Sequence, residues 1–404
     1  MQGRNDPRPC NSRPARRPHP VIQLLSAGVL SAVVAFATAF AIVLAGLAAV
    51  GASQAEAASG LFALCIATGA LTVLFSLRWR MPVVIAWSTP GAALLIVSGA
   101  PEGGYAAAIG AFLAAAVMMV VAGVWRPFGR AVAAIPTPLA NAMLGGILLD
   151  LCLAPVRAVG ALPELALPIV LAWAVAFRFA RFYAVPIAVL VTAVIVVTAT
   201  PIPPAATAGG LPALVPVVPA FTFDALVGMA LPLFIVTMAS QSIPGLAVLN
   251  ANGYRPAVGP IFSATGIAGV ATAVFGAHSL SLVAITAALT AGPEAHPDAG
   301  RRWVAAVAAG CTYVALGFGA AFAAAFIAES PPLLIQAVAG LALLGSFGSA
   351  LSSALAGDQD RLPAVIAFVV TASGIAFFGV GAAFWGLLAG GGLMALLRLK
   401  VKVP

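Results

Sequence analysis

The sequence predicts an all-α polytopic membrane protein. Of its 404 residues, 62% are hydrophobic and only 7% are charged, whereas a soluble domain carries about 25% charged residues. The apolar runs are long and do not alternate with polar residues, as in 21–50 and 105–124. A run of ~20 apolar residues spans a bilayer as a helix, and a helix satisfies its own backbone hydrogen bonds in lipid. A barrel strand would instead need ~10 alternating residues, so helices are expected.

Fourteen apolar segments are expected to cross the membrane, and a Pro-rich linker at 204–221 separates the first seven from the last seven. Six prolines lie between residues 201 and 219, and proline cannot continue a helix. The first repeat is predicted at 21–203 and the second at 222–400. The predicted segments are 21–50, 58–77, 82–99, 103–124, 131–152, 164–180, 184–203, 222–249, 259–275, 278–292, 302–327, 331–356, 362–377 and 379–398.

The basic residues fit this topology. With the N-terminus inside the cell, all 19 Lys and Arg residues except Arg157 fall in a cytoplasmic tail or loop. This is the positive-inside bias of membrane proteins. It predicts a bacterial inner-membrane protein with both termini in the cytoplasm, and residues 1–20 are expected to be a disordered basic tail. The net charge of +8 is thereby explained without nucleic-acid binding.

An odd number of segments in each half means that the second half enters from the opposite side. The arrangement is a 7+7 inverted repeat, in which short interrupted segments at matching positions point to a transporter binding site. The third segment of the first half is interrupted at 87–91, and the third segment of the second half begins with an interruption at 276–281. These two segments are therefore predicted to be half-helices.

The first interruption has the sequence WSTPGA. Ser88 or Thr89 can cap a helix, and Pro90 suits a first helical turn. The hypothesis is a half-helix that begins in mid-membrane and binds an anion through its free N–H groups. The alternative is a proline kink in a continuous helix. The candidate substrate-binding residues are Trp87, Ser88, Thr89, Pro90, Gly91 and Ala92.

The second interruption holds His278, the one histidine in a predicted span. An ionisable residue within the membrane is costly, and histidine titrates near neutral pH. His278 is therefore the candidate proton-coupling residue, and the alternative is a neutral histidine bonded to the backbone. The N–H groups of 279–281 are expected to face the same anion from the opposite side. The candidate substrate-binding residues are His278, Ser279, Leu280 and Ser281.

The eighth segment carries a polar cluster of Thr237, Ser240, Gln241 and Ser242. Gln241 can both donate and accept hydrogen bonds, which suits a carboxylate or a protonated acid, and Ser242 is a candidate beside it. The alternative is that these side chains join helices, as Ser, Thr and Gln commonly do in membranes. Asn141 is interpreted as a site of close helix packing rather than a ligand contact.

Several other functions find no support. The chain has no GxxxxGK[ST] motif for a nucleotide, no catalytic arrangement of Ser, His and Asp, and no metal-ligand spacing among its Cys and His residues. Glu294, His296 and Asp298 lie in a Pro-rich loop before Arg301 and Arg302, which favours a structured turn with ion pairs. We therefore expect no enzyme activity, no metal and no cofactor, and we expect a proton gradient to drive transport.

The chain resembles the BenE family of benzoate/proton symporters from about residue 20 to the C-terminus. The similar strings are AWSTPGAALL at 86–95, ALPLFIVTMASQ at 230–241, NGYRP at 252–256, AITAAL at 284–289 and AGPEAHPD at 291–298. The resemblance implies the fold of uracil permeases and sulfate-permease-like transporters. Segments 1–4 and 8–11 would form a core domain and segments 5–7 and 12–14 a gate domain, with substrate between the third and tenth half-helices.

Two positions depart from the uracil-permease pattern. His278 stands where that family has a substrate-binding glutamate, and Gln241 matches another glutamate of the eighth segment. Both departures remove negative charge, as an anionic substrate requires, because carboxylates would repel it. They also leave the permeases' proton site without a counterpart here.

The expected function is secondary active import of benzoate or a similar aromatic carboxylate with protons, by movement of the core against the gate. The alternatives are transport or exchange of another small anion, such as sulfate or another organic acid, and a passive anion channel. The expected partners are the carboxylate, protons and the lipid bilayer, and a homodimer is one option for the assembly.

Overall fold

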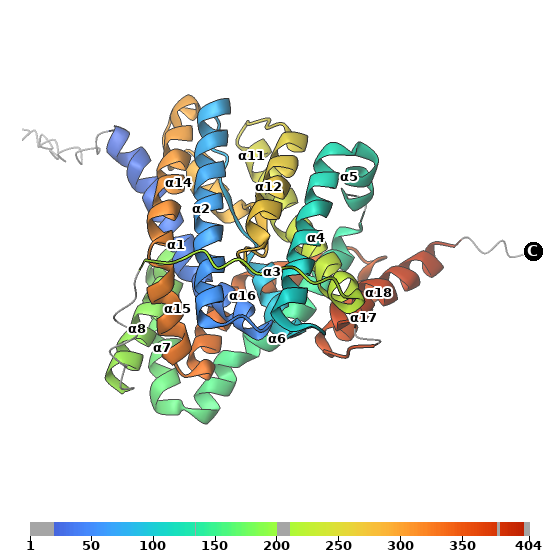
Figure 1. The fold of residues 1–404 in the computed structure, drawn as a ribbon. Helices are drawn as coiled ribbons and strands as arrows, with labels where there is room; N and C mark the ends of the chain where they lie inside the picture. The colour runs from blue at the N-terminus through green and yellow to red at the C-terminus, as the bar shows by residue number, and fades with distance from the viewer. Residues whose placement is uncertain (1–19, 134, 200–210, 378–379, 400–404) are drawn as a thin grey trace, which may run out of the picture.

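The computed structural model describes residues 20–133, 135–199, 211–377 and 380–399, so the predicted basic tail at 1–20 lies almost wholly outside the described residues. Helices dominate the described chain (Figure 1). The elements of the first half are α1 (Pro20–Ala49), α2 (Gln54–Trp79), β1 (Ile85–Trp87), α3 (Thr89–Ser98), α4 (Gly104–Val124), α5 (Arg126–Ala133), α6 (Thr137–Ala161), α7 (Pro163–Phe179), η1 (Arg181–Tyr183) and α8 (Ala184–Ala199). Those of the second half are η2 (Ala225–Ala230), α10 (Leu231–Thr237), η3 (Met238–Ser242), α11 (Ile243–Ala251), α12 (Val258–Ala273), β2 (Leu280–Leu282), α13 (Ala284–Ala291), η4 (Ala299–Arg301), α14 (Trp303–Gly317), α15 (Ala320–Glu329), α16 (Pro332–Ala354), α17 (Arg361–Ala372) and α18 (Ala382–Arg398).

Within the described residues, six helices are long and apolar enough to cross a membrane. They include α1, α2, α4, α6, α16 and the run 225–251, in which two π-helical turns, η2 and η3, flank α10. Shorter apolar helices include α3, α8, α12, α17 and α18. The chain is therefore a polytopic helical membrane protein, and the count of fourteen spans stays a prediction.

The segment predicted as one span at 302–327 is two helices. α14 and α15 meet at an angle of 57°, and the break falls at Phe318-Gly319, where Gly317 and Gly319 weaken helix propensity. If the two helices are counted as one bent span, the described residues contain seven segments long and apolar enough to cross a membrane.

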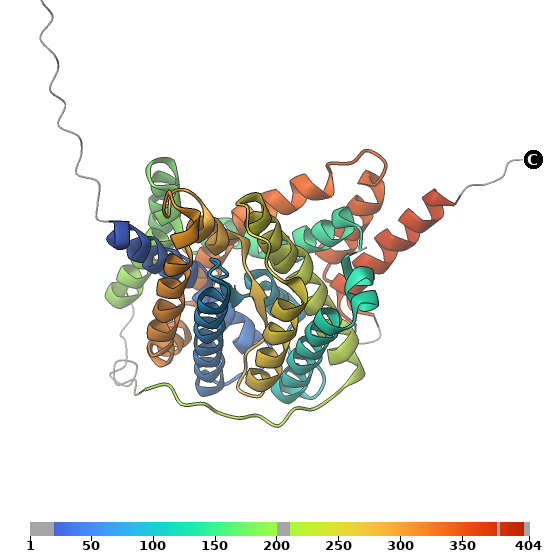
Figure 2. The ribbon, with the colours of Figure 1, turned by 90° about the horizontal axis from the view of Figure 1, so that it is seen from above.

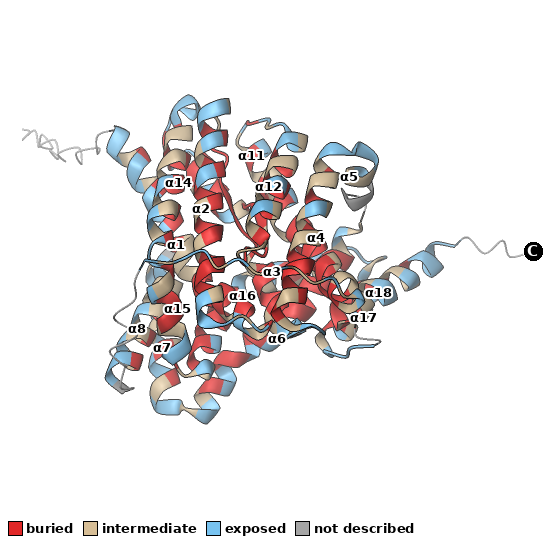
Figure 3. Cartoon of the chain, viewed as in Figure 1, coloured by how far each residue is buried: buried red, intermediate tan, exposed pale blue. Residues whose placement is uncertain are grey.

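Two short strands from the two halves of the chain pair at the centre of the molecule. β1 and β2 are antiparallel, and Trp87 lies opposite Leu280 while Ile85 lies opposite Leu282. Both strands are fully buried, and Figure 3 shows buried positions concentrated on the helix faces around them. Because each strand leads into a short helix, α3 and α13 begin beyond opposite ends of the ladder.

The helix packing is repeated between the halves. α2 packs against α14 and α4 against α12, while α7 contacts α8 and α17 contacts α18. Small residues let these backbones approach, as membrane helix pairs require. A Cβ added at Gly69 would lie only 2.5 Å from the Gly310 carbonyl oxygen on α14.

The described part of the predicted linker, 211–221, is extended rather than helical. Figure 2 shows this yellow-green segment running along one side of the molecule. Its backbone is anchored at three points: the Val215 N–H donates to Ser59 Oγ at 2.9 Å, that of Val217 to Val274 O at 2.8 Å and that of Ala220 to Ala106 O at 2.9 Å. Since Val274 belongs to the second half and the other two acceptors to the first, the linker fastens both halves.

A carboxylate fixes the end of this linker. Asp224 Oδ2 accepts from the Glu102 N–H at 2.8 Å. Burial acts to raise the pKa of Asp224, but hydrogen bonds from Thr222 and from the backbone of Glu102 and Ala225 outweigh it, and the net pKa is lowered. Asp224 is therefore a charged carboxylate at neutral pH.

Candidate functional site

The chain is interrupted at Ser88, where β1 ends and α3 begins. The Ser88 hydroxyl caps α3 by accepting from the Gly91 N–H at 3.0 Å, and Ser88 O accepts from the Ala92 N–H at 2.9 Å. Pro90 has no N–H. Of the four residues Thr89 to Ala92, whose N–H groups were predicted to bind an anion, only Thr89 has an N–H outside these bonds. Anion binding at this turn stays a prediction.

The second interruption differs from the prediction in register. The N–H groups of 279–281 were expected at a helix N-terminus, but Leu280–Leu282 is β2, and α13 begins at Ala284. Val283 precedes α13 without a side-chain cap. A helix leaves its first N–H groups without intrahelical acceptors, so the uncapped donors of this half are those of Ala284 to Thr286.

His278 joins the two interruptions. Its Nε2 lies 3.0 Å from Ser88 O, and the side chain is 1% exposed. A carbonyl oxygen only accepts, so Nε2 carries the hydrogen and Nδ1 is the acceptor in the neutral ring. His278 thus bonds to the backbone, as the alternative interpretation had it, and its predicted role in proton coupling is a separate question.

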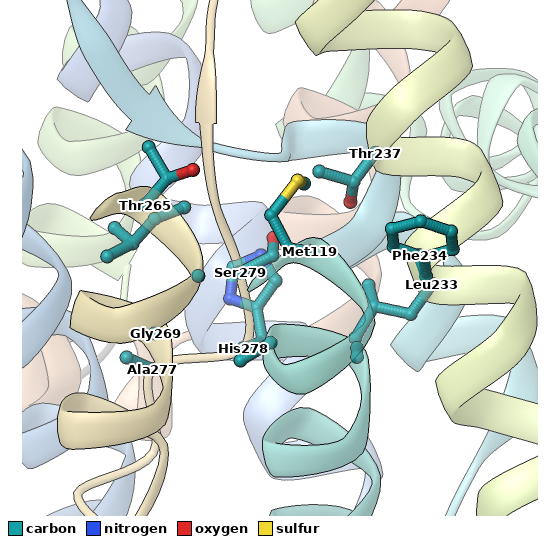
Figure 4. A pocket seen from close by; sticks show the side chains of 13 residues that line it. Met119, Leu233, Phe234, Thr237, Thr265, Gly269, Ala277, His278 and Ser279 are labelled. Carbon is teal, nitrogen blue, oxygen red and sulfur yellow. The ribbon is translucent and has the colours of Figure 1, made fainter. Parts of the chain in front are cut away.

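A small void of about 20 Å³ adjoins His278. Figure 4 shows His278 and Ser279 before β2, Met119 on α4 and Thr237 on α10 around it. Three buried polar atoms at this void have no hydrogen-bond partner among the described residues: His278 Nδ1, Ser279 Oγ and Thr237 Oγ1. Since ~10–15 Å³ accommodates one water molecule, the void is too small for an aromatic acid.

A cavity of about 740 Å³ lies on the other side of the interruption, within the ~300–1,000 Å³ typical of small-molecule sites. Pro90 of α3 and Ala284 and Ile285 of α13 bring the first turns of both short helices to its wall. Its remaining walls come chiefly from η3 and α11 on one side and from α6 and α16 on the other. The lining side chains are largely apolar, with polar groups from Thr137, Asn141, Ser240, Gln241, Ser346, Ser349 and Ser353.

Only two of the predicted site residues, Pro90 and Gln241, line this cavity. Trp87 is 3% exposed and its ring packs edge-on against Phe36 and Tyr313, at centroid distances of 6.2 and 5.6 Å. It therefore belongs to the core and does not line the cavity. The other predicted residues also lie off the cavity wall: Ser88, Thr89, Gly91, Ala92, Ser242, His278, Ser279, Leu280 and Ser281.

Several cavity residues were missed in the sequence. Ser346, Ser349 and Ser353 recur at spacings of three and four, which places them on one face of α16, and this spacing was a readable signal. Asn141 also lines the cavity and donates to Thr137 O at 2.9 Å, and its interpretation as a packing residue stays a prediction. Arg181 was read only as a topology signal.

The loop predicted as a turn with ion pairs contains one such pair and is also fixed by backbone hydrogen bonds. Arg301 pairs with Asp298 at 3.5 Å, but the buried Arg302 donates to the carbonyl oxygens of His296 and Ala291, each at 2.7 Å. No cluster of His, Cys, Asp or Glu that could hold a metal occurs within the described ranges.

The apolar helices and the two buried interruptions define a class of protein, a polytopic helical membrane protein. The sequence matches the family model of the benzoate membrane transport protein, BenE, over residues 20–396. The chain belongs to this family.

Two relatives of known name cover most of the chain. The inner membrane protein YdcO of Escherichia coli is 39% identical over 377 residues, which is 93% of this chain and 96% of YdcO. The benzoate membrane transport protein of Acinetobacter baylyi is 31% identical over 332 residues, which is 82% of this chain and 84% of that protein.

Solved structures share the fold at low sequence identity. The transmembrane domain of the cyanobacterial bicarbonate transporter BicA has a TM-score of 0.59 at 16% identity, covering 91% of this chain and 97% of that one. The structure of SLC26A9 has a TM-score of 0.63 at 15% identity, covering 93% and 65%. These likenesses concern the fold alone.

Proposed function

We propose that this chain imports a small aromatic carboxylate such as benzoate together with protons, by alternating access across the bacterial inner membrane. The observation that carries the proposal is the 740 Å³ cavity, which is lined by the uncapped first turn of α13, by Gln241 and by apolar side chains. Membership of the benzoate membrane transport family supports the substrate class.

In this proposal the carboxylate sits at the N-terminus of α13. The N–H groups of Ala284 and Ile285 and the helix dipole would hold its charge, and the Gln241 amide would donate a further hydrogen bond. The aromatic ring would lie against apolar side chains such as Ile235, Met238 and Leu144, which line the same cavity.

The proposal includes fourteen spans arranged as two inverted repeats, with both termini in the cytoplasm. Two interruptions at matching positions and the repeated helix pairs support this arrangement. The core would contain segments 1–4 and 8–11, and the gate segments 5–7 and 12–14. The cavity would then lie between core elements, α3, η3, α11 and α13, and the gate helices α6 and α16.

His278 remains the proposed proton carrier. Its Nδ1 faces the small void, so protonation there would leave the bond from Nε2 to Ser88 O intact. A buried positive charge is costly unless it is paired. A carboxylate bound near the same interruption would favour that charge, and proton and substrate binding would strengthen each other by the same factor.

Uptake of labelled benzoate into proteoliposomes under an imposed pH gradient tests the proposal. Protein-free liposomes correct for diffusion of the undissociated acid. Accumulation above equilibrium that collapses with the gradient is expected, with little competition from sulfate. Equilibration without accumulation would indicate a channel, and stronger competition by sulfate than by benzoate would indicate an inorganic-anion transporter.

A further inference from the structure

The mouth of the cavity can be assigned to one side of the membrane. Among its lining residues, Thr137 is the first residue of α6, Ser353 is the last but one of α16, and Arg181 is the second residue after the end of α7. Basic residues lie in or beside the helix ends on this side: Arg126 and Arg130 in α5, Arg178 in the last turn of α7, Arg181 in η1 and Arg361 at the start of α17. By the positive-inside bias this side would be cytoplasmic, which would place the mouth of the cavity on the cytoplasmic side.

Arg181 is the one charged side chain among the described residues that line this cavity. It is exposed, and its guanidinium carbon lies 5.0 Å from the centre of the Phe177 ring. It forms no ion pair with any Asp or Glu that the structure describes. The wall of the cavity thus carries one uncompensated positive charge beside apolar surfaces, an arrangement that focuses an electric field and concentrates anions.

We propose that Arg181 recruits the carboxylate at the cytoplasmic mouth and selects anions over neutral and cationic solutes. The role is positioning and selection, because the first turn of α13 and Gln241 would still form the binding site. This inference rests on the proposed function, since an anion-concentrating charge matters for transport only if the cargo is an anion.

The chain supplies a matched control for an ordinary interfacial arginine. Arg178 lies in the last turn of α7, is also exposed, and its guanidinium carbon lies 5.5 Å from the centre of the Phe179 ring. It does not line the cavity. If Arg181 served only to mark membrane topology, its substitution would have the same effect as substitution of Arg178.

The first test measures benzoate transport from each side of oriented vesicles. Arg181→Gln is expected to raise KM at the cytoplasmic face by about threefold to tenfold with kcat retained, and Arg181→Lys to stay close to wild type. KM at the opposite face should change little, as should both values in Arg178→Gln. Equal KM values for Arg181→Gln and Arg178→Gln would overturn the inference.

A second test reads the charge of the cavity without transport. Ser349→Cys puts a thiol on the cavity wall, in a background with Cys10→Ala and Cys311→Ala, while Cys65 and Cys152 are buried. Its reaction rates with an anionic and a cationic methanethiosulfonate reagent are compared in inverted vesicles.

Arg181→Gln should lower the anion-to-cation rate ratio by about threefold to tenfold, and Arg178→Gln should not. An equal ratio in the two variants would overturn the inference. If the wild-type protein moves no benzoate, the proposed function fails, whereas this thiol reaction still decides the role of Arg181.

Discussion

His278 makes one bond that is structural and leaves one nitrogen available for chemistry. Nε2 donates to Ser88 O across the two interruptions, while Nδ1 faces the void with Thr237 and Ser279. A structural role of His278 needs only the Nε2–H donor, whereas a proton-coupling role needs Nδ1 to take up a proton. Two substitutions therefore separate the roles.

His278→Ala is expected to lower the free energy of unfolding by about 2–4 kcal/mol, because it removes a buried hydrogen bond and leaves a cavity. His278→Gln should recover most of this loss, since its amide can donate to Ser88 O. Thermal unfolding of both purified variants in detergent measures the difference, with wild type as the reference.

Transport by the same two variants tests the proton role. Neither Ala nor Gln can titrate, so pH-driven accumulation of benzoate should be lost in both, including the stable Gln variant. Full accumulation by either variant would exclude His278 as the proton carrier, and equal destabilisation of both would contradict the donor role of Nε2.

At the scale of elements, the sequence located the interruptions but not their conformation. Pro90 and Gly276 were readable breaks, and the hydroxyl cap at Ser88 follows from its position before Pro90. The strands Ile85–Trp87 and Leu280–Leu282 were not readable, since three apolar residues carry no period. Their pairing also joins residues nearly 200 positions apart. The start of α13 at Ala284 and the cavity or core that each side chain faces therefore depend on tertiary contacts.

The polar cluster of the eighth segment shows the same limit. Both interpretations, substrate contact and helix joining, were left open from sequence. The π-helical turn η3 sends Gln241 to the large cavity, while Thr237 lies at the small void and Ser242 is buried away from both. Local helix propensity does not predict a π-helical turn, which depends on tertiary contacts.

The close contact of α2 with α14 gives an element-scale prediction. Gly69→Leu should lower the free energy of unfolding by about 1–3 kcal/mol, because its side chain would meet Gly310 O and Val314 on α14. Thermal unfolding in detergent checks this.

Gly348→Leu on α16 is the matched control, since nothing lies within 4 Å of an added Cβ there. It should leave stability unchanged or slightly raised, because Gly disfavours a helix interior. Equal unfolding temperatures for the two variants would show that α2 and α14 do not pack as closely as described.

At the scale of the whole molecule, the function depends on where the two halves meet. The β1–β2 ladder joins one interruption from each half, and the linker at 211–221 is bonded to both halves. The cavity lies beside this junction, so a movement of α6 and α16 relative to α3 and α13 would change its access. At this scale, composition and charge predicted a membrane protein. The cavity could not be predicted from the sequence, because its lining residues come from helices far apart in the chain.

Assembly beyond one chain stays a prediction. A homodimer would be detected by native mass spectrometry of the purified protein with bound lipid. The proposed site requires no residue of a second copy, since both short helices come from one chain.

The most direct test of the central claim, that an anion binds at the first turn of α13 beside Gln241, is equilibrium binding of labelled benzoate to the purified protein. Gln241→Glu puts a negative charge into the cavity and should weaken binding at least tenfold, as about 1.4 kcal/mol of repulsion would. Gln336→Glu makes the same change on α16 away from the cavity and should bind as wild type does. Benzoate binding of equal strength to Gln241→Glu and wild type would contradict the account.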